Sequence, residues 1–354
     1  MKSAKIYKVG GCVRDMVLGV DSNDIDYVVV NATQEDMLNA GFSQVGKDFP
    51  VFLHPETGDE YALARTERKV GLGYTGFTFS TENVTLEDDL KRRDFTINSM
   101  ALSVDGKIID PFNGLSDLKD GVIQHTSEAF AEDPVRIFRG ARFAGRYDFK
   151  VADSTKQLMK QLVAMGEVEA MTKDRVIVEL TKLSEVQFFD KAISILQEVG
   201  VIAKLFGSIN IEELNKIEAV VTEHKSFFRL VFLAKNQDKK WMQAHKFSAD
   251  VMDFVIVWQK TYSLLCKFKQ LSAQDMILLF EQADALRKPE RFKQLLSFTQ
   301  ILTDSFVSKQ HHQFEKLLSA IKEIDMETLV TQCDKAKIKE TVRQARIQAI
   351  STVI

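Results

Sequence analysis

Short stretches rich in β-branched and aromatic residues, separated by glycine and other turn residues, characterise the first part of the chain. They predict β-strands at residues 6–9, 26–30, 51–54 and 60–65. Residues 55–58, Pro-Glu-Thr-Gly, form a turn between the last two strands. Helical patterns follow the first two strands, at residues 13–18 and 33–40, and Thr33 is placed to cap the second helix. We therefore expect a small mixed α/β domain at residues 1–128.

Glycine and proline are distributed unevenly, and this separates the rest of the chain from its beginning. None of the 17 glycines lies after Gly207, and only Pro289 of the five prolines lies beyond Pro134. A glycine-free stretch of this length can hardly be a sheet with tight turns. Apolar residues recur there at helical spacing, as in Val251, Phe254, Val255 and Trp258.

A denser apolar run at residues 276–280 suits a buried helix. The predicted fold class is α+β, a mixed sheet with helices followed by an all-α region. We expect a catalytic head at residues 1–128, a helical neck at 129–205, and a helical body and tail at 206–354.

Composition and charge narrow the class of protein. Hydrophobic residues make up 45% and charged residues 27% of the 354 positions, as in soluble globular proteins of two or three domains. No apolar run approaches the roughly 18 residues of a membrane helix, and residues 1–8 lack the features of a signal peptide. The three cysteines lie far apart, without metal-ligand spacing. We expect a cytoplasmic protein that does not enter membranes. The net charge of −3 neither favours nor excludes a nucleic acid partner.

Two carboxylates, Asp24 and Asp26, lie at the start of a predicted strand. Residues i and i+2 of a strand point to the same face, so the two side chains lie beside each other. Mg²⁺ bound by one or two carboxylates and by substrate phosphates would relieve their repulsion. A solvated strand end is the alternative interpretation of this pair.

A glycine turn precedes the carboxylates in the sequence. Gly10 and Gly11 follow the first strand and open a helix that carries Arg14. Such a turn lets a phosphate approach the backbone and the positive end of the helix, and Arg14 adds a forked donor. An ordinary strand-to-helix turn is the alternative. A phosphate-binding turn followed by a carboxylate pair on the next strand is the order found in polymerase β-like nucleotidyltransferases.

Two arginine-rich segments follow. Residues 92–98 read Arg-Arg-Asp-Phe-Thr-Ile-Asn, which is either a basic surface loop or a contact from Arg93 to a nucleotide. Residues 132–142 place Asp133 before Pro134, so Asp133 is a natural helix N-cap. Every third residue then carries a guanidinium, which predicts one continuous basic side of the helix: Arg136, Arg139 and Arg142.

Together these motifs, in this order, resemble the class II tRNA nucleotidyltransferases, the CCA-adding family, over residues 5 to about 205. The segment 172–175 with Glu179 resembles a later motif of the family that stabilises the neck. The resemblance implies template-independent addition of CCA to the 3′ end of tRNA from CTP and ATP. It also implies two Mg²⁺ ions held by Asp24 and Asp26.

The resemblance assigns further roles to residues of the nucleotide site. Triphosphate and sugar contacts fall to Gly11, Arg14 and Arg93, and further nucleotide contacts to Arg139 and Arg142. Asp133 and Arg136 would read the base. Since a carboxylate accepts from the exocyclic amine of cytosine or adenine, we expect UTP and GTP to be rejected.

Several alternatives stay open. Glu60 is placed as a possible third metal ligand or as an exposed strand residue. Residues 68–77 contain three glycines and predict a mobile loop that, in the family, favours full CCA addition. A basic run at residues 335–346 would contact tRNA phosphates or form a solvated helix face. No His-Asp pair is found, so no HD phosphohydrolase domain is expected. A poly(A) polymerase, a CC-only or A-only enzyme and a non-catalytic RNA-binding protein are the rival functions.

Overall fold

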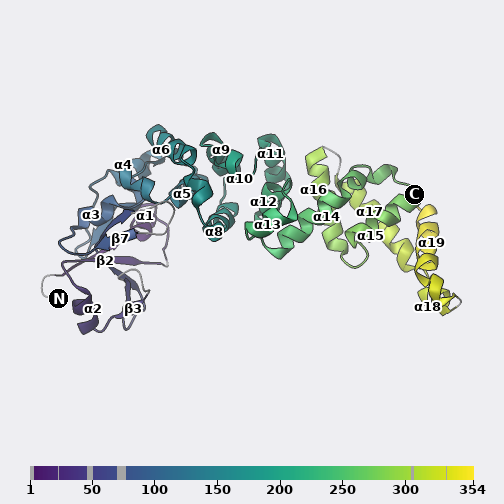
Figure 1. Ribbon diagram of the computed structural model, residues 1–354, viewed down its shortest axis with the longest axis horizontal. Coiled ribbons are helices and arrows are strands. Elements are labelled where there is room, and N and C mark those ends of the chain that lie inside the picture. Colours follow the sequence, from purple (N-terminus) through teal and green to yellow (C-terminus); the bar gives the residue numbers. More distant parts are fainter. Residues whose placement is uncertain (1–3, 23, 46–50, 70–76, 304–306, 332) are drawn as a thin grey trace. The chain divides into compact units, whose positions relative to one another are not determined.

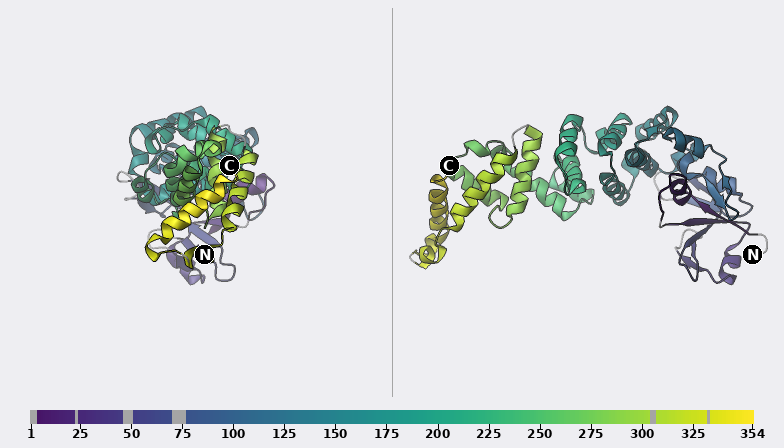
Figure 2. Two further views of the ribbon diagram at one scale, coloured as in Figure 1. Left: turned by 90° about the vertical axis from the view of Figure 1, so that its right-hand side faces the viewer. Right: turned by 180° about the vertical axis from the view of Figure 1, so that it is seen from behind.

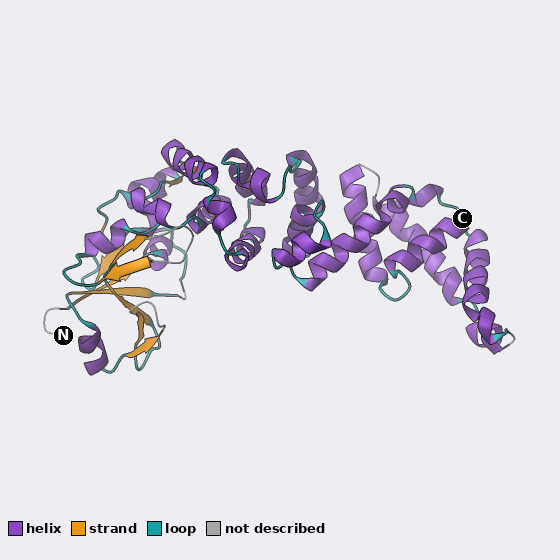
Figure 3. Cartoon of the chain, viewed as in Figure 1, coloured by secondary structure: helices purple, strands orange, loops and turns teal. Residues whose placement is uncertain are grey.

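The computed structural model describes residues 4–22, 24–45, 51–69, 77–303, 307–331 and 333–354. The chain divides into two compact units, Met1–Ser208 and Ile209–Ile354. Strands are confined to the beginning of the chain, and helices form the remainder (Figure 3). The predicted α+β class is confirmed.

A seven-stranded mixed sheet is the centre of the first unit, in the order β3-β4-β5-β2-β1-β8-β9. Its strands are β1 Lys5–Val9, β2 Asp26–Val30, β3 Ser43–Val45, β4 Val51–Leu53, β5 Glu60–Leu63, β8 Ala101–Ser103 and β9 Ile108–Ile109. β2 runs parallel to β5 and antiparallel to β1. A separate hairpin is formed by β6 Thr66–Lys69 and β7 Phe77–Ser80. The glycine-containing loop predicted at residues 68–77 lies largely outside the described residues.

Alternation along β2 explains why this strand lies inside the sheet. Val28 and Val30 contribute to an apolar cluster on one face, together with Val9, while Val29 contributes to a second cluster on the other face. Both faces of β2 are therefore covered, and only its first residue, Asp26, is exposed. The neighbouring strands therefore hold Asp26, at the N-terminal end of β2, in a fixed position.

Helices surround the sheet of the first unit and continue into the predicted neck (Figure 1). They are α1 Gly11–Val17, α2 Gln34–Asn39, α3 Leu86–Lys91, α4 Gly114–Asp120, α5 Val135–Tyr147, α6 Asp153–Ala164, α7 Glu167–Ala170, α8 Lys173–Ser184, α9 Phe189–Glu198 and α10 Val201–Leu205, with 3₁₀ helices η1 Thr96–Asn98 and η2 Glu128–Glu132. α5 packs against both α8 and α9. One short strand pair, β10 Val122–Ile123 with β11 Lys150–Val151, interrupts the helical region.

The second unit is built from helices throughout its described residues, 209–303, 307–331 and 333–354. Their bounds are α11 Ile211–Val220, α12 Lys225–Ala234, α13 Lys239–Ala244, α14 Ala249–Cys266, α15 Ala273–Ala283, α16 Pro289–Thr303, α17 Val307–Lys322, α18 Met326–Thr331 and α19 Ile338–Ser351, with η3 Phe268–Gln270 and η4 Lys335–Lys337. α14 packs against α15 and α16, and these helices stay together in the further views (Figure 2).

Aromatic rings fill the core of the second unit. Phe254 and Phe298 meet edge to face with their centroids 5.9 Å apart, and Phe292 lies 4.5 Å from Phe314. The apolar run at residues 276–280 is buried as predicted, except for Leu278, which is partly exposed. None of the described helices is long and apolar enough to span a membrane.

Most predicted elements of the first unit are found. Thr33 caps α2 through a reciprocal capping box with Asp36. The helix predicted after Pro134 begins formally at Val135, but Pro134 already has helical dihedral angles, and the Asp133 carboxylate accepts from the Val135 N–H at 3.1 Å. Asp133 is therefore a helix cap, as expected.

Candidate active site

Asp26 is the first residue of β2 and lies beside the glycine turn, and Asp24 precedes it by two positions, just outside the strand. Asp26 pairs in register with Val9, the last residue of β1, and Gly10 follows directly. Asp24 and Asp26 are both exposed. Partial desolvation and the negative charge of Asp24 raise the pKa of Asp26; Arg93 opposes this, and Glu60 adds to it. The carboxylates of Asp24, Asp26 and Glu60 thus create an excess of negative charge at the surface, and a bound cation would offset this charge.

Glu60 lies next to Asp26 across the sheet. The two residues pair in register between the parallel strands β2 and β5, so their side chains share a face. Among the described residues, however, no group of three or more carboxylate, histidine or cysteine side chains has the geometry of a metal site. The arrangement suits a cation that takes two carboxylates from the protein and its remaining ligands from substrate oxygens and water.

Gly10, more than Gly11, is the glycine that the turn requires. Its backbone has φ 74°, a conformation that L-residues with side chains rarely adopt. A Cβ at this position would also lie 2.8 Å from Nη1 of Arg93. At Gly11 an added Cβ would meet only an ordinary contact, 3.5 Å from Arg14. Hence the turn and the guanidinium of Arg93 approach each other closely because residue 10 has no side chain.

Arg93 is held in this position by Asp89, whose carboxylate is fully buried. Nη2 of Arg93 donates to Oδ2 of Asp89 at 3.1 Å. The other carboxylate oxygen accepts from Nη2 of Arg92 at 2.6 Å. Burial opposes ionisation, but the charges of Arg93 and Arg92 hold the pKa of Asp89 below its ordinary value.

Arg14 is buried inside the first unit. Its guanidinium donates to Asn98 at 2.5 Å and to Asp15 at 2.9 Å. It also lies over the rings of Phe143 and Tyr147, 5.1 and 5.2 Å from their centroids. These contacts join α1 to α5, and a direct contact from Arg14 to a phosphate stays a prediction.

Residues 94–99 are buried, whereas Arg92 and Arg93 are partly exposed at the end of α3. Two residues of this segment, Asp94 and Asn98, take part in a chain of buried hydrogen bonds. Asn98 donates to Asp94 at 3.0 Å, and Asp94 accepts from Nε of Arg139 at 2.7 Å. Although burial disfavours the charged form, Arg139 and the Asn98 hydrogen bond hold the pKa of Asp94 below its ordinary value.

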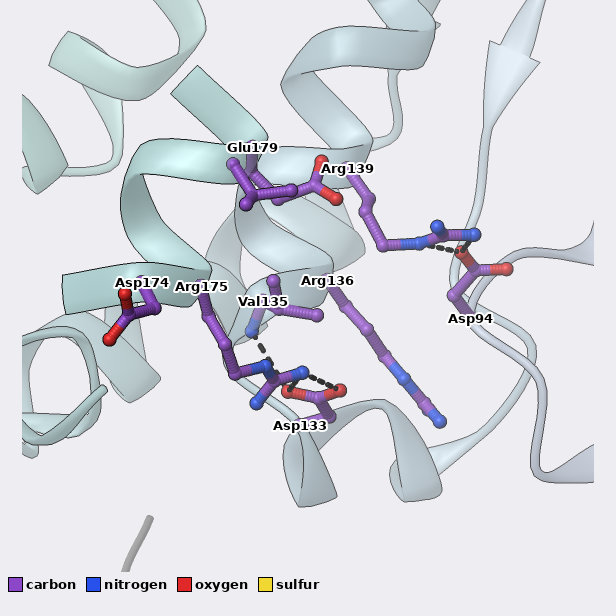
Figure 4. Close-up of a pocket in the computed structure, with 9 residues that line it drawn as sticks. Asp94, Asp133, Val135, Arg136, Arg139, Asp174, Arg175 and Glu179 are labelled. Atoms are coloured by element: carbon purple, nitrogen blue, oxygen red, sulfur yellow. Dashed lines mark hydrogen bonds and ion pairs between the residues drawn. The ribbon is translucent and has the colours of Figure 1, made fainter. Parts of the chain in front are cut away.

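A pocket of about 540 Å³ opens between the start of α5, the segment at Asp94 and the first turns of α8 (Figure 4). Its lining is mostly charged and consists of Asp94, Asp133, Val135, Arg136, Arg139, Asp174, Arg175, Val178 and Glu179. Three of the predicted nucleotide residues, Asp133, Arg136 and Arg139, thus meet in one cavity. Arg142 is absent from this lining and pairs with Glu179 at 3.1 Å.

The two predicted base-reading residues have different surroundings in this pocket. Nη2 of Arg175 donates to both oxygens of Asp133, at 3.0 and 2.7 Å (Figure 4). Arg136 donates to the backbone carbonyls of Ala129 and Arg92, both at 2.8 Å. Both side chains are therefore held in fixed orientations by contacts within the protein.

The expected basic side of α5 is offset by acidic partners. Arg139 pairs with Asp94 and Arg142 with Glu179, while Arg136 is engaged by carbonyl groups. Arg136 and Arg139 therefore face a pocket lining of nearly balanced charge, and these three arginines do not form an open cationic surface.

Sequence reasoning missed two residues that orient the predicted ones. Asp89 precedes Arg92 and Arg93 by three and four positions, the spacing of ion pairs within one helix, so this signal was present in the sequence. Arg175 was recognised only as part of the neck segment. Its pairing with Asp133 spans 42 positions, and no local pattern reveals such a contact.

Several known proteins resemble this chain in sequence and in fold. Residues 6–124 match the Poly A polymerase head domain family. A CCA-adding enzyme of Bordetella pertussis is 40% identical over 355 aligned residues, covering 98% of this chain and 96% of that protein.

Two solved structures share the fold. One is a CCA-adding enzyme in complex with ATP, with a TM-score of 0.73 at 24% identity, covering 98% of this chain and 86% of that one. The other is the Thermotoga maritima CCA-adding enzyme complexed with tRNA, with a TM-score of 0.70 at 22% identity over 100% of this chain and 92% of that one. The sequence match extends over nearly the whole length of both proteins, and on this evidence the chain belongs to the CCA-adding enzyme family.

Proposed function

We propose that this enzyme adds CCA to the 3′ end of tRNA from CTP and ATP, with Asp24 and Asp26 holding Mg²⁺ and with the pocket at Asp133 selecting the base. One observation carries the proposal. The exposed carboxylates Asp24 and Asp26, the glycine turn and Arg93 lie close together where strands β1 and β2 meet that turn. The relatives that are complexed with ATP and with tRNA support the substrates.

The reaction is a nucleotidyl transfer. The 3′ oxygen of the tRNA forms a bond to the α-phosphorus of the nucleotide, and the bond to the bridging oxygen breaks, releasing pyrophosphate. Enzymes of this family generally use divalent metals. Bound Mg²⁺ would lower the pKa of the attacking 3′ hydroxyl and would neutralise negative charge on the leaving pyrophosphate. Asp24 and Asp26 provide the carboxylate oxygens that this ion prefers.

Arg93 is placed to bind the triphosphate. Its guanidinium lies between buried Asp89 and the turn at Gly10, and its charge lowers the pKa of Asp26. From this position it can donate to phosphate oxygens while the turn offers backbone N–H groups. Roles for Gly11, Arg14 and Arg142 in nucleotide binding also belong to this proposal.

Base selection falls to Asp133 and Arg136. Asp133 accepts two bonds from Arg175 and one from the Val135 N–H, and it keeps about one further acceptor site, because an ionised carboxylate has about four lone-pair sites. It can accept from the exocyclic amine of cytosine or adenine, while Arg136 donates to the ring acceptor beside it. A carbonyl of uracil or guanine would face the carboxylate without a donor, and this opposition excludes UTP and GTP.

The division into head, neck and body stays part of the proposal, as does a location in the cytoplasm. Arg14 and Asp94 form contacts to α5, so the proposed head and neck share one polar network within the first unit.

The test uses a tRNA transcript that ends before its CCA, supplied with Mg²⁺ and with labelled nucleotides singly and in combination. We expect two additions from CTP and a third only when ATP is also present. Two additions without a third would identify a CC-only enzyme, and one addition restricted to ATP on tRNA that ends in CC would identify an A-only enzyme. A long ladder with ATP alone would indicate a poly(A) polymerase instead.

A further inference from the structure

We propose that Asp89 is a positioning residue for nucleotide binding, which acts by holding the guanidinium of Arg93 against the turn at Gly10. This inference rests on the proposed contact of Arg93 with the triphosphate. Asp89 lies on α3 and is completely buried, and it has no route to the substrate of its own. Any effect it has on nucleotide binding must pass through the residues that it contacts.

The two oxygens of Asp89 have separate partners. Oδ1 accepts from the backbone N–H of Arg65 at 3.3 Å and from Nε and Nη2 of Arg92 at 3.0 and 2.6 Å. Oδ2 accepts from Nε and Nη2 of Arg93 at 3.4 and 3.1 Å. One oxygen thus ties α3 to the end of the sheet, and the other orients the arginine of the active site.

Because only Oδ2 contacts Arg93, replacing this one oxygen should change the orientation of Arg93 while the contacts of Oδ1 are kept. The side chain of Arg93 is 18% exposed, so one edge reaches the site while the other is held by Asp89. Without that carboxylate oxygen the flexible side chain would leave the position that Gly10 keeps free, and binding a triphosphate would require ordering it again.

Asp89→Asn isolates this effect. Three donors converge on the Oδ1 position, so the carboxamide oxygen takes that place and its NH₂ group faces Arg93, donor against donor. We expect the KM for CTP and the Ki of inorganic tripolyphosphate to rise by about tenfold or more, as for loss of one charge-assisted hydrogen bond, with a smaller change in kcat. The tripolyphosphate probe carries neither base nor sugar, so it reports on the phosphate contacts alone.

Asp88→Asn is the matched control. Asp88 adjoins Asp89 on α3 and closes the capping box with Thr85, so this variant weakens the same helix without a contact to Arg93. Its KM and Ki should equal those of the wild type. Should Asp89→Asn fold poorly, Asp89→Glu keeps both oxygens and the charge but displaces them, and it should raise the same two constants by a smaller factor.

A double-mutant cycle with Arg93→Ala tests whether Asp89 acts on nucleotide binding through Arg93. If Asp89 acts through Arg93, the variant that carries both changes has the KM and Ki of Arg93→Ala alone. Multiplying effects would overturn the positioning role, as would a folded Asp89 variant with wild-type constants. If Arg93→Ala itself left KM and Ki unchanged, the proposed triphosphate contact would be wrong, and the role of Asp89 would be rejected with it.

Discussion

The carboxylates at the proposed metal site and those of the charged pocket beside α5 have opposite electrostatic surroundings. Asp24 and Asp26 are exposed at their surfaces, but partial desolvation and then the charge of Asp24 raise the pKa of Asp26. Asp94 and Asp133 are paired with Arg139 and Arg175. The first pair has an excess of negative charge that a cation would offset, whereas the second is neutralised by arginines of the protein itself. The same residue type thus stands in two different surroundings, which agree with the proposed roles in metal binding and in base recognition.

Asp26→Asn should have the largest effect on activity. Since several kcal/mol of metal catalysis depend on this ligand, we expect incorporation to fall by about a thousandfold or more. Thermal stability should stay equal or rise, because the substitution removes like-charge repulsion. Primer extension and a thermal melt measure the two quantities, and Asp105→Asn in an exposed turn is the control. A large fall in melting temperature would contradict the picture of an unpaired carboxylate.

Asp94→Asn should instead reduce stability. The change leaves Arg139 without its charged partner; since the Arg139 side chain is 33% exposed and water offsets part of the loss, we expect a cost of about 2 kcal/mol of unfolding free energy, less than for a fully buried pair. Denaturation in urea, followed with a probe in the first unit, measures this loss. Asp148→Asn removes a surface pair with Lys191 and should cost less than about 1 kcal/mol. Equal costs for the two variants would mean that Asp94 is not a buried anchor.

Asp133→Asn should relax base selection. Its carboxamide keeps an oxygen for Arg175 and presents an NH₂ group that can donate to the carbonyl of uracil. Preference for CTP over UTP should fall by about 10- to 100-fold, the range of roughly 1–3 kcal/mol for one paired base contact. Single-nucleotide incorporation rates provide the measurement, with Asp153→Asn, at the exposed first residue of α6, as control. Unchanged discrimination would remove Asp133 from base recognition.

The pH dependence of stability should show the smallest difference. The native pKa of Asp94 lies below 3.8, its ordinary value. Its contribution is therefore fully present above that value and is lost as the pH falls through the native pKa. The gap in unfolding free energy between wild type and Asp94→Asn should stay constant at neutral pH and close in acid. Asp26 has the opposite sign, since its raised pKa means that protonation in mild acid favours the folded state. A gap that widens in acid would refute the sign for Asp94.

The sequence predicted those parts of the molecule that depend on local pattern. Strand β2, the cap at Thr33 and the helical second unit follow from periodicity and turn residues, and Asp24 and Asp26 follow from i, i+2 spacing. Partners distant in the chain could not be predicted this way. The burial of Arg14 depends on Phe143 and Tyr147, and the orientation of Asp133 depends on Arg175, so both required the tertiary structure.

The contacts of Arg14 with α5 mean that the predicted head, residues 1–128, depends on a helix that follows it in the chain. A fragment that ended at residue 128 would keep Arg14 but lose the two rings that cover it, and Asp94 would lose Arg139. Arg14 would keep its ion pair with Asp15 but lose its aromatic cover, and Asp94 would lose its counter-charge, so the contacts that fix both side chains in the folded unit would be gone. The catalytic sheet is therefore not a transferable module, and any exchange of it between enzymes would have to carry α5 along.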